Sequence, residues 1–327
     1  MGIARLFTTH RKLLLVGFLL VILIFLVTFP LYTRAYHLRL LTSILMYIIM
    51  SVSWAMFSGP TGYMSLAPAA FIGTGMYTTA LLQEILPFPV IIVIGGLVSS
   101  ALALLIGLVT LRLKGMYFAI FTFGLVVFMR EVVSYAEGKI TGAFGQHIIP
   151  LPNETIFYIM LAVTVATLLV AYFIRRSRLG LAMLSIGGNE DAAAHMGVNT
   201  TMVKVFTFAI SSFFVGAAGV IIAPNLIYIS APIAFSPIYS FMPILMAIFG
   251  GMGQLYGPVI GAIVFGYLDR TLSLEFPQYF MLTFGILLIS VILFLPSGLV
   301  GLIQKLQKAG PIARLLNRGK EEQHANT

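Results

Sequence analysis

Long apolar runs alternate with short polar breaks along most of the chain. Each run has about 20 residues, the length that an α-helix needs to cross the hydrocarbon core of a bilayer. The strands of an outer-membrane barrel would instead alternate apolar and polar residues. The pattern predicts an all-α polytopic membrane protein with about ten transmembrane segments, some of them short or broken. We place them at 13–33, 38–57, 62–82, 89–110, 115–135, 154–174, 202–223, 235–249, 255–270 and 278–295.

The composition agrees with this class. Hydrophobic residues make up 60% of the chain and charged residues 9%, whereas a water-soluble domain has about 25% charged residues. The net charge of +9 does not indicate nucleic-acid binding, because the basic residues lie between apolar runs and at both termini, where cytoplasmic anchors lie. The chain has no cysteine, which excludes disulfides and thiolate sites.

The basic residues also predict the orientation, because cytoplasmic loops are enriched in Lys and Arg. Ten crossings place nearly all of them on one side, with Arg34 and Arg39 as exceptions, so we expect both termini in the cytoplasm. Residues 1–304 would form the transmembrane domain, and residues 305–327 a basic cytoplasmic tail. The first run lacks a small-x-small cleavage site, so we expect a retained helix rather than a signal peptide.

The hydrophilic segment 175–201 interrupts the pattern of short loops. Asn189 is a good N-cap, Glu190 and Asp191 would lie in the first turn, and Gly197 is placed to end a helix. These residues predict a helix of about two turns on the cytoplasmic face. The segment is either an ordinary surface linker or a docking helix for a soluble partner, whose groove could accept the small side chains of 192–194.

The stretch GPTGYMSLAPAAFIGTGMY, residues 59–77, carries four glycines and two prolines within apolar sequence. Broken backbone at membrane depth survives only against protein or a wet cavity, so this stretch should face a pathway rather than lipid. GGMGQLYGPVIG, 250–261, echoes it weakly in the second half of the chain, which is consistent with an inverted repeat of two five-helix halves without establishing one. The alternative is that these glycines simply allow close helix packing. The candidate pathway residues are Gly59, Gly62, Ser65, Pro68, Gly73, Gly75, Gly250, Gly253 and Gly257.

Catalytic motifs are missing from the sequence. It contains no G-x-x-x-x-G-K-[ST] phosphate loop and no G-x-S-x-G elbow, and its five histidines lack metal-binding spacing. The ionisable residues within apolar runs are the neighbours Arg130 and Glu131 and the neighbours Asp269 and Arg270. Because each acid adjoins an arginine near a segment end, we interpret them as interfacial anchors rather than a proton site. These features argue against an intramembrane enzyme.

Several motifs occur in the order found in one known family. GYMSLAPAAFIGTGMYTTALL (62–82) is similar to G-x-x-S-L-G-H-A-A-F-x-G-x-G-A-Y, and LRLKGMYFAIFTFGL (111–125) to L-R-L-R-G-x-Y-x-A-I-x-T-L-G. RSRLGLAMLSIGGNEDAAAHMGV (176–198) is similar to R-S-x-x-G-R-A-x-x-A-I-R-x-N-x-x-A-A-x-x-x-G-I, and GGMGQLYGPVIGA and LPSGLVGL follow. By these motifs nearly the whole chain resembles the LivM-type permease subunit of branched-chain amino-acid ABC importers.

The resemblance implies a permease in a bacterial or archaeal inner membrane, importing branched-chain amino acids or a related small polar solute. Its partners would be a second, LivH-like permease subunit, two cytoplasmic ATPases and an extracytoplasmic binding protein. This chain would hold no cofactor, because the ATPases would bind ATP and Mg. A stand-alone secondary carrier is the alternative.

The resemblance also makes the helix around 184–197 a coupling helix that docks in an ATPase groove, with Glu190 and Ala193 expected at the contact. The chain departs from the family at Gly187 and Gly188, which should loosen this loop, and at Ala67-Pro68, which replaces Gly-His. The residues assigned to ATPase coupling are Arg178, Gly180, Asn189, Glu190, Asp191, Ala192, Ala193 and Gly197.

Overall fold

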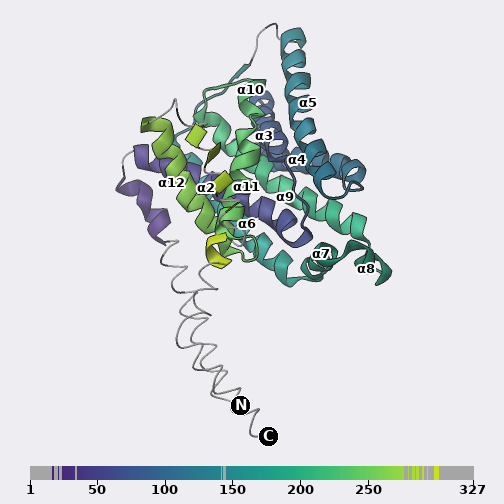
Figure 1. The fold of residues 1–327 in the computed structure, drawn as a ribbon. Helices are drawn as coiled ribbons and strands as arrows, with labels where there is room; N and C mark the ends of the chain where they lie inside the picture. The colour runs from purple at the N-terminus through teal and green to yellow at the C-terminus, as the bar shows by residue number, and fades with distance from the viewer. Residues whose placement is uncertain are drawn as a thin grey trace, which may run out of the picture.

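The structure is a computed structural model that describes residues 17, 21, 24–33, 35–140, 142, 145–275, 279, 282–283, 285–286, 289–290, 293 and 298–301. The described part is helical apart from one pair of two-residue strands (Figure 1). The longer helices are α2 (Ala35–Thr61), α4 (Phe88–Thr110), α5 (Met116–Ile140), α6 (Asn153–Arg176), α9 (Thr200–Ile222) and α12 (Tyr256–Glu275). The shorter ones are η1 (Phe29–Leu31), α3 (Pro68–Leu82), α7 (Arg178–Gly188), α8 (Glu190–His195), η2 (Ala223–Asn225), α10 (Ala231–Ala234) and α11 (Ile238–Gly250).

Six stretches in the described part are long and apolar enough to cross a membrane. They are Ala35–Thr61, Phe88–Thr110, Met116–Lys139, Asn153–Arg176, Thr200–Asn225 and Ala231–Gly250. The all-α membrane class is therefore confirmed. The total of ten segments and the inverted repeat stay predictions, because parts of 13–33 and most of 278–295 lie outside the described residues. The predicted segment 62–82 is a helix of only 15 residues, α3, which at 1.5 Å per residue is too short to span the bilayer core.

Helix α9 lies at the centre of the bundle and packs on α4, α3 and α2. In an 18-residue apolar window of Thr200–Asn225, the stretch that contains α9, 83% of the residues are buried. In the corresponding window of Met116–Lys139, which contains most of α5, only 17% are buried, and α5 stands at the edge of the bundle (Figure 1). Small residues allow α3 and α9 to approach closely: a Cβ atom added at Gly75 would lie 2.0 Å from the Gly216 carbonyl oxygen. Such small-residue contacts are how membrane helices pack where no hydrophobic effect drives association.

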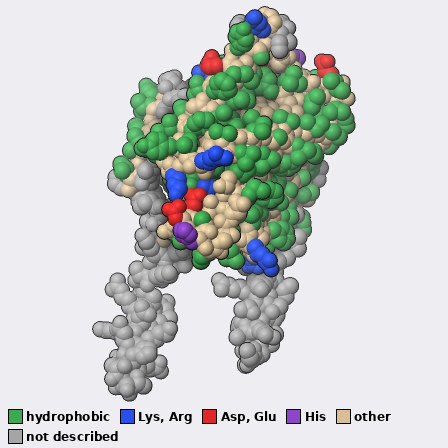
Figure 2. All heavy atoms as spheres, turned by 90° about the vertical axis from the view of Figure 1, so that its right-hand side faces the viewer, with side chains coloured by type: hydrophobic (Ala, Val, Ile, Leu, Met, Phe, Trp, Pro, Cys, Tyr) green, Lys and Arg blue, Asp and Glu red, His purple; other side chains and the backbone are tan. Residues whose placement is uncertain are grey.

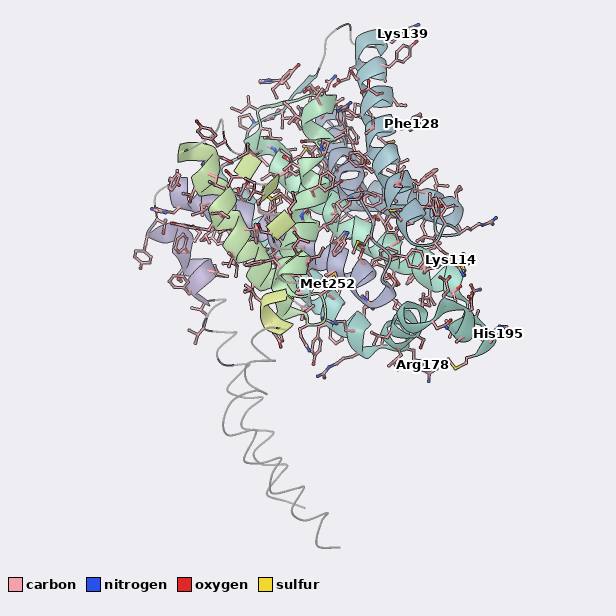
Figure 3. All side chains as sticks on the ribbon, in the orientation of Figure 1. Lys114, Phe128, Lys139, Arg178, His195 and Met252 are labelled. Carbon is pink, nitrogen blue, oxygen red and sulfur yellow. The ribbon has the colours of Figure 1, made fainter. Side chains whose placement is uncertain are left out.

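One end of the bundle carries Arg112, Lys114, Arg175, Arg176 and Arg178, and we call it the basic end. Figure 3 shows Lys114, Arg178 and His195 at this end and Lys139 at the far end of α5. The far end also holds β1 (Gln146–His147) and β2 (Tyr228–Ile229), which pair antiparallel. Most charged side chains on the face in Figure 2 lie near its top or in its lower half, with mostly apolar side chains between these two groups.

The expected loosening of the loop at Gly187 and Gly188 is wrong. Both residues belong to α7, which is helical to Gly188. A Cβ atom at Gly187 would lie 2.1 Å from the Pro60 carbonyl oxygen. This glycine therefore allows α7 to cross tightly over the end of α2 rather than making the segment flexible.

Candidate functional site

The chain between α2 and α3 is unwound over residues 62–67, and we call these residues the unwound segment. Local sequence explains where α2 ends: Pro60 lies in its last turn, and Gly62 adopts φ of 72°. Proline cannot continue the backbone ladder and a left-handed glycine ends a helix. Pro68 then begins α3 at a position where its missing N–H costs nothing. The predicted break is therefore present, and it is six residues long.

Side chains from α2 and α5 form hydrogen bonds with the unwound backbone. The indole Nε1 of Trp54 on α2 donates to the Ser65 carbonyl at 2.8 Å. The Leu66 N–H donates to the Thr122 hydroxyl on α5 at 3.0 Å. Trp54 is 3% exposed and Thr122 is fully buried. These partners replace the helical bonds that the segment lacks, as the apolar interior requires.

A second interrupted element meets this segment. Helices α10 and α11 form one apolar stretch that is broken at 235–237, and Ser240 lies in the first turn of α11. Its hydroxyl donates to the Leu66 carbonyl at 2.7 Å and accepts from the Ala69 N–H at 3.2 Å. One fully buried hydroxyl therefore joins the unwound segment, the start of α3 and the start of α11.

The predicted pathway glycines have packing or turn roles within this chain. A Cβ atom at Gly59 would lie 3.3 Å from the Met252 carbonyl oxygen, so the starts of the stretches 59–77 and 250–261 lie against each other. A Cβ atom at Gly73 would lie 2.5 Å from the Phe235 ring, and one at Gly250 would lie 1.8 Å from the Gly257 carbonyl oxygen. A Cβ atom at Gly62 or Gly253 would have no neighbour within 4 Å. Gly75 packs on α9, and Ser65 and Pro68 are buried.

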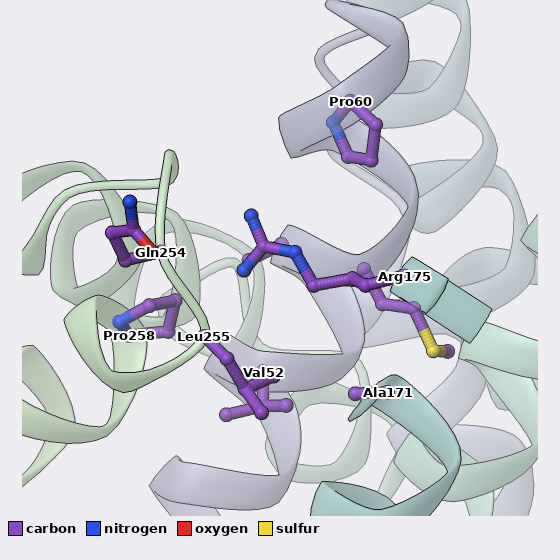
Figure 4. A pocket seen from close by; sticks show the side chains of 9 residues that line it. Val52, Pro60, Ala171, Arg175, Gln254, Leu255 and Pro258 are labelled. Carbon is purple, nitrogen blue, oxygen red and sulfur yellow. The ribbon is translucent and has the colours of Figure 1, made fainter. Parts of the chain in front are cut away.

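These contacts support the packing interpretation of the glycines. That Gly59, Gly62, Ser65, Pro68, Gly73, Gly75, Gly250, Gly253 and Gly257 flank a pathway stays a prediction. The corner between α11 and α12 is held at the basic end by Arg175, whose guanidinium donates to the Gly253 carbonyl at 2.6 Å across a recess next to Pro60 and Gln254 (Figure 4).

The predicted surface helix is present as α8. The Asn189 side chain accepts from the Ala192 N–H at 3.0 Å as its N-cap, and Gly197, with φ of 87°, follows its end. Asp191, Ala192, Ala194 and His195 are exposed, whereas Ala193 is fully buried. In this chain, therefore, the neighbours of Ala193 present the outward face of α8.

The other residues assigned to coupling lie just before α8. Arg178 is the exposed first residue of α7, and Gly180 is buried where a Cβ atom would lie 2.4 Å from the Ile174 carbonyl oxygen. Whether any of these residues contacts an ATPase stays a prediction.

Glu190 turns inward rather than toward solvent. Its carboxylate accepts from the Lys204 ammonium at 2.6 Å and from the Tyr63 hydroxyl. Burial alone would raise the pKa of Glu190, but the hydrogen bonds from Lys204 and Tyr63 outweigh it and hold the pKa below its usual value. Asp191 instead forms an exposed salt bridge with Lys114 at 3.0 Å.

Lys204 and Tyr63 were not among the residues predicted from the sequence. The signal for Lys204 was available, because a lone lysine inside the predicted segment 202–223 marks a functional candidate by default. Tyr63 carried no such signal, since tyrosines are common at membrane interfaces.

The two acid–arginine neighbours within apolar runs differ in their surroundings. Arg130 and Glu131 pair with each other at 2.9 Å on the exposed side of α5. Asp269 accepts from the Tyr47 hydroxyl at 3.2 Å, and the Arg270 guanidinium lies over the Tyr36 ring. Their role as interfacial anchors stays a prediction.

Comparisons with known proteins identify relatives along most of the chain. Residues 36–292 match the family described as branched-chain amino acid transport system / permease component. The high-affinity branched-chain amino acid transport system permease protein LivM of Salmonella typhimurium is 27% identical over 329 residues, covering 90% of this chain and 76% of the relative. LivM of Escherichia coli K12 has the same identity and coverage. The LivH permease protein of S. typhimurium is 29% identical over 54% of this chain and 61% of its own length. No solved structure matches the chain.

The Thr122→Val substitution tests whether the unwound segment depends on its side-chain partners. Valine keeps the shape of threonine but leaves the Leu66 N–H without its acceptor, which should cost about 1–3 kcal/mol of stability. Thr164→Val is the matched control, because this buried hydroxyl bonds only a carbonyl of its own helix. We expect a lower thermal unfolding temperature in detergent for Thr122→Val than for Thr164→Val. Equal unfolding temperatures would contradict this role for Thr122.

Proposed function

The chain belongs to the family of branched-chain amino acid transport system permease components, and we propose that it forms part of the route by which a binding-protein-dependent, ATP-driven importer takes up branched-chain amino acids or a related small polar solute. It is a transport subunit and not an enzyme. The names of its relatives support the amino-acid substrate, since LivM and LivH are both permease proteins of a branched-chain amino acid transport system.

The observation that carries this proposal is the continuous connection between α8 and the unwound segment. Helix α8 is short, capped and exposed at the basic end, as a docking helix must be. Glu190 at its start contacts Tyr63 in the unwound segment, which in turn is bonded to α2, α5 and α11. A partner that moved α8 would therefore act directly on the interrupted part of the bundle.

We propose that the basic end faces the cytoplasm, following the enrichment of Lys and Arg there. The exposed face of α8, with Asp191, Ala194 and His195, would then occupy the groove of a cytoplasmic ATPase. Two such ATPases would supply ATP hydrolysis, and a binding protein would deliver the solute at the far end, where β1 and β2 lie. Both termini would be cytoplasmic.

We propose that the second permease subunit packs against α5. This helix is little buried within the chain and carries the Arg130–Glu131 pair about 20 Å from its start, at 1.5 Å per residue. This proposal replaces the interpretation of Arg130 and Glu131 as interfacial anchors, because charges at such a depth are costly against lipid and usually face protein or a water-filled cavity. A LivH-like subunit on this side would cover them, and the solute would pass between the two permeases by alternating access.

Reconstitution separates this function from that of a stand-alone carrier. We expect uptake of radiolabelled leucine into proteoliposomes only when this chain is combined with its second permease, ATPases and binding protein, with ATP on the ATPase side. The purified chain alone should give the background of empty liposomes. ATP-independent uptake by the chain alone would support the carrier and contradict the importer.

Cysteine cross-linking tests the docking face, and the chain suits it because it has no native cysteine. We expect Ala194→Cys, on the exposed face of α8, to form a disulfide with cysteines placed along the ATPase groove. Ala193→Cys is the control: it changes the same helix by the same substitution, but its side chain is fully buried and should not react. Cross-linking of position 193 but not 194 would show that α8 presents its other face.

A further inference from the structure

The ammonium of Lys204 lies inside the protein near the start of α9, and the residue is 2% exposed. Burying an ammonium is costly unless it is paired and its N–H donors have acceptors. Lys204 donates to the Leu111 carbonyl at 2.9 Å, the Tyr63 hydroxyl at 3.1 Å and the Glu190 carboxylate at 2.6 Å. All three ammonium donors are thus used, and each acceptor belongs to a different part of the fold.

Tyr63 and Glu190 also bond to each other, since the tyrosine hydroxyl donates to the second carboxylate oxygen of Glu190. Together with Lys204 they form a closed triangle, which we call the Lys204 triangle. The Lys204 ammonium also lies 4.5 Å from the centroid of the Tyr63 ring. Because every member contacts both others, one distance cannot change much without breaking a bond to a buried charge.

The other attachments of α8 are weaker or less directional. Its second ion pair, between Asp191 and Lys114, has side chains that are 79% and 64% exposed, and such surface pairs contribute at most about 1 kcal/mol. Ala193 packs inside the protein but makes no polar contact of its own through its methyl group. The Lys204 triangle is therefore the enclosed polar link between α8 and the unwound segment.

We propose that Lys204 is a positioning residue that makes α8 and the unwound segment move as one unit, so that displacement of α8 by an ATPase reaches the interrupted helices. Tyr63 precedes Ser65 and Leu66, whose backbone is bonded to α2, α5 and α11. Through Tyr63, the triangle thus connects α8 to the segment in which the two interrupted elements meet. This inference rests on the proposed function, because it concerns the link between ATP hydrolysis and transport.

The sharpest test is Tyr63→Phe in the assembled importer. Phenylalanine keeps the ring, which packs on Phe118, and keeps the Lys204–Glu190 ion pair, but it removes the hydroxyl that joins both to the unwound segment. We expect the complex to assemble and hydrolyse ATP, while the amount of solute moved per ATP hydrolysed falls roughly fivefold or more, which is an ordinary coupling between two sites.

Tyr47→Phe is the matched control. It removes a buried tyrosine hydroxyl from another carboxylate, Asp269, at a site earlier along α2. We expect it to leave the ratio of transport to ATP hydrolysis unchanged.

Charge removal provides an independent variant. Lys204→Met alone leaves Glu190 without its buried partner and should impair assembly, whereas Lys204→Met combined with Glu190→Gln removes both charges. We expect the double variant to assemble better than the single one and to remain poorly coupled. A purely structural role for Lys204 predicts that coupling returns once the double variant assembles, and that result would overturn the proposal.

The outcomes also separate this inference from the proposed function. If the wild-type complex shows no ATP-dependent uptake, the proposed function fails. If the wild-type complex transports and Tyr63→Phe transports as much solute per ATP, the function stands and the role of the Lys204 triangle is overturned.

Discussion

The structure depends on satisfying the backbone around Ser65 and Leu66, where the unwound segment runs inside the apolar bundle. Each unpaired peptide group there would cost several kcal/mol, because no water is available to replace the missing helical bonds. Trp54, Thr122 and Ser240 supply the partners from α2, α5 and α11. The break is therefore a fixed joint between helices that are distant in sequence, and any rearrangement of the joint must involve all of them.

The local features of this joint could be predicted from the sequence, and its partners could not. Gly62 and Pro68 mark where α2 ends and α3 begins through their own backbone chemistry. In the same way Asn189 and Gly197 mark the limits of α8. Ser240 lies 174 residues from Leu66, and nothing in the sequence around either residue indicates that they meet.

The role of a glycine is also not determined by its local sequence. The pair Gly187 and Gly188 was expected to loosen a loop, because glycine is the most flexible residue in isolation. In the fold, Gly187 allows the backbone of α7 to pack closely against the backbone of Pro60. Whether a glycine gives freedom or close packing depends on the helix opposite it, which is a property of the tertiary structure. The buried lysine of α9 is a different case. Its position inside an apolar run is a signal that can be read from the sequence alone.

By the proposal above, α8 and the unwound segment form one mechanical unit, held by a buried cation and two oxygen partners. Double electron–electron resonance can test this proposal by measuring the distance between spin labels on cysteines placed at the exposed positions Met64 and His195 of the assembled importer. A third label at the exposed Tyr267, on α12, which is not one of the helices of the joint, provides the reference. We expect the 64–195 distance to be the same in the nucleotide-free and ATP-bound complexes while the 195–267 distance changes. A 64–195 distance that changes as much as the 195–267 distance would contradict the proposal.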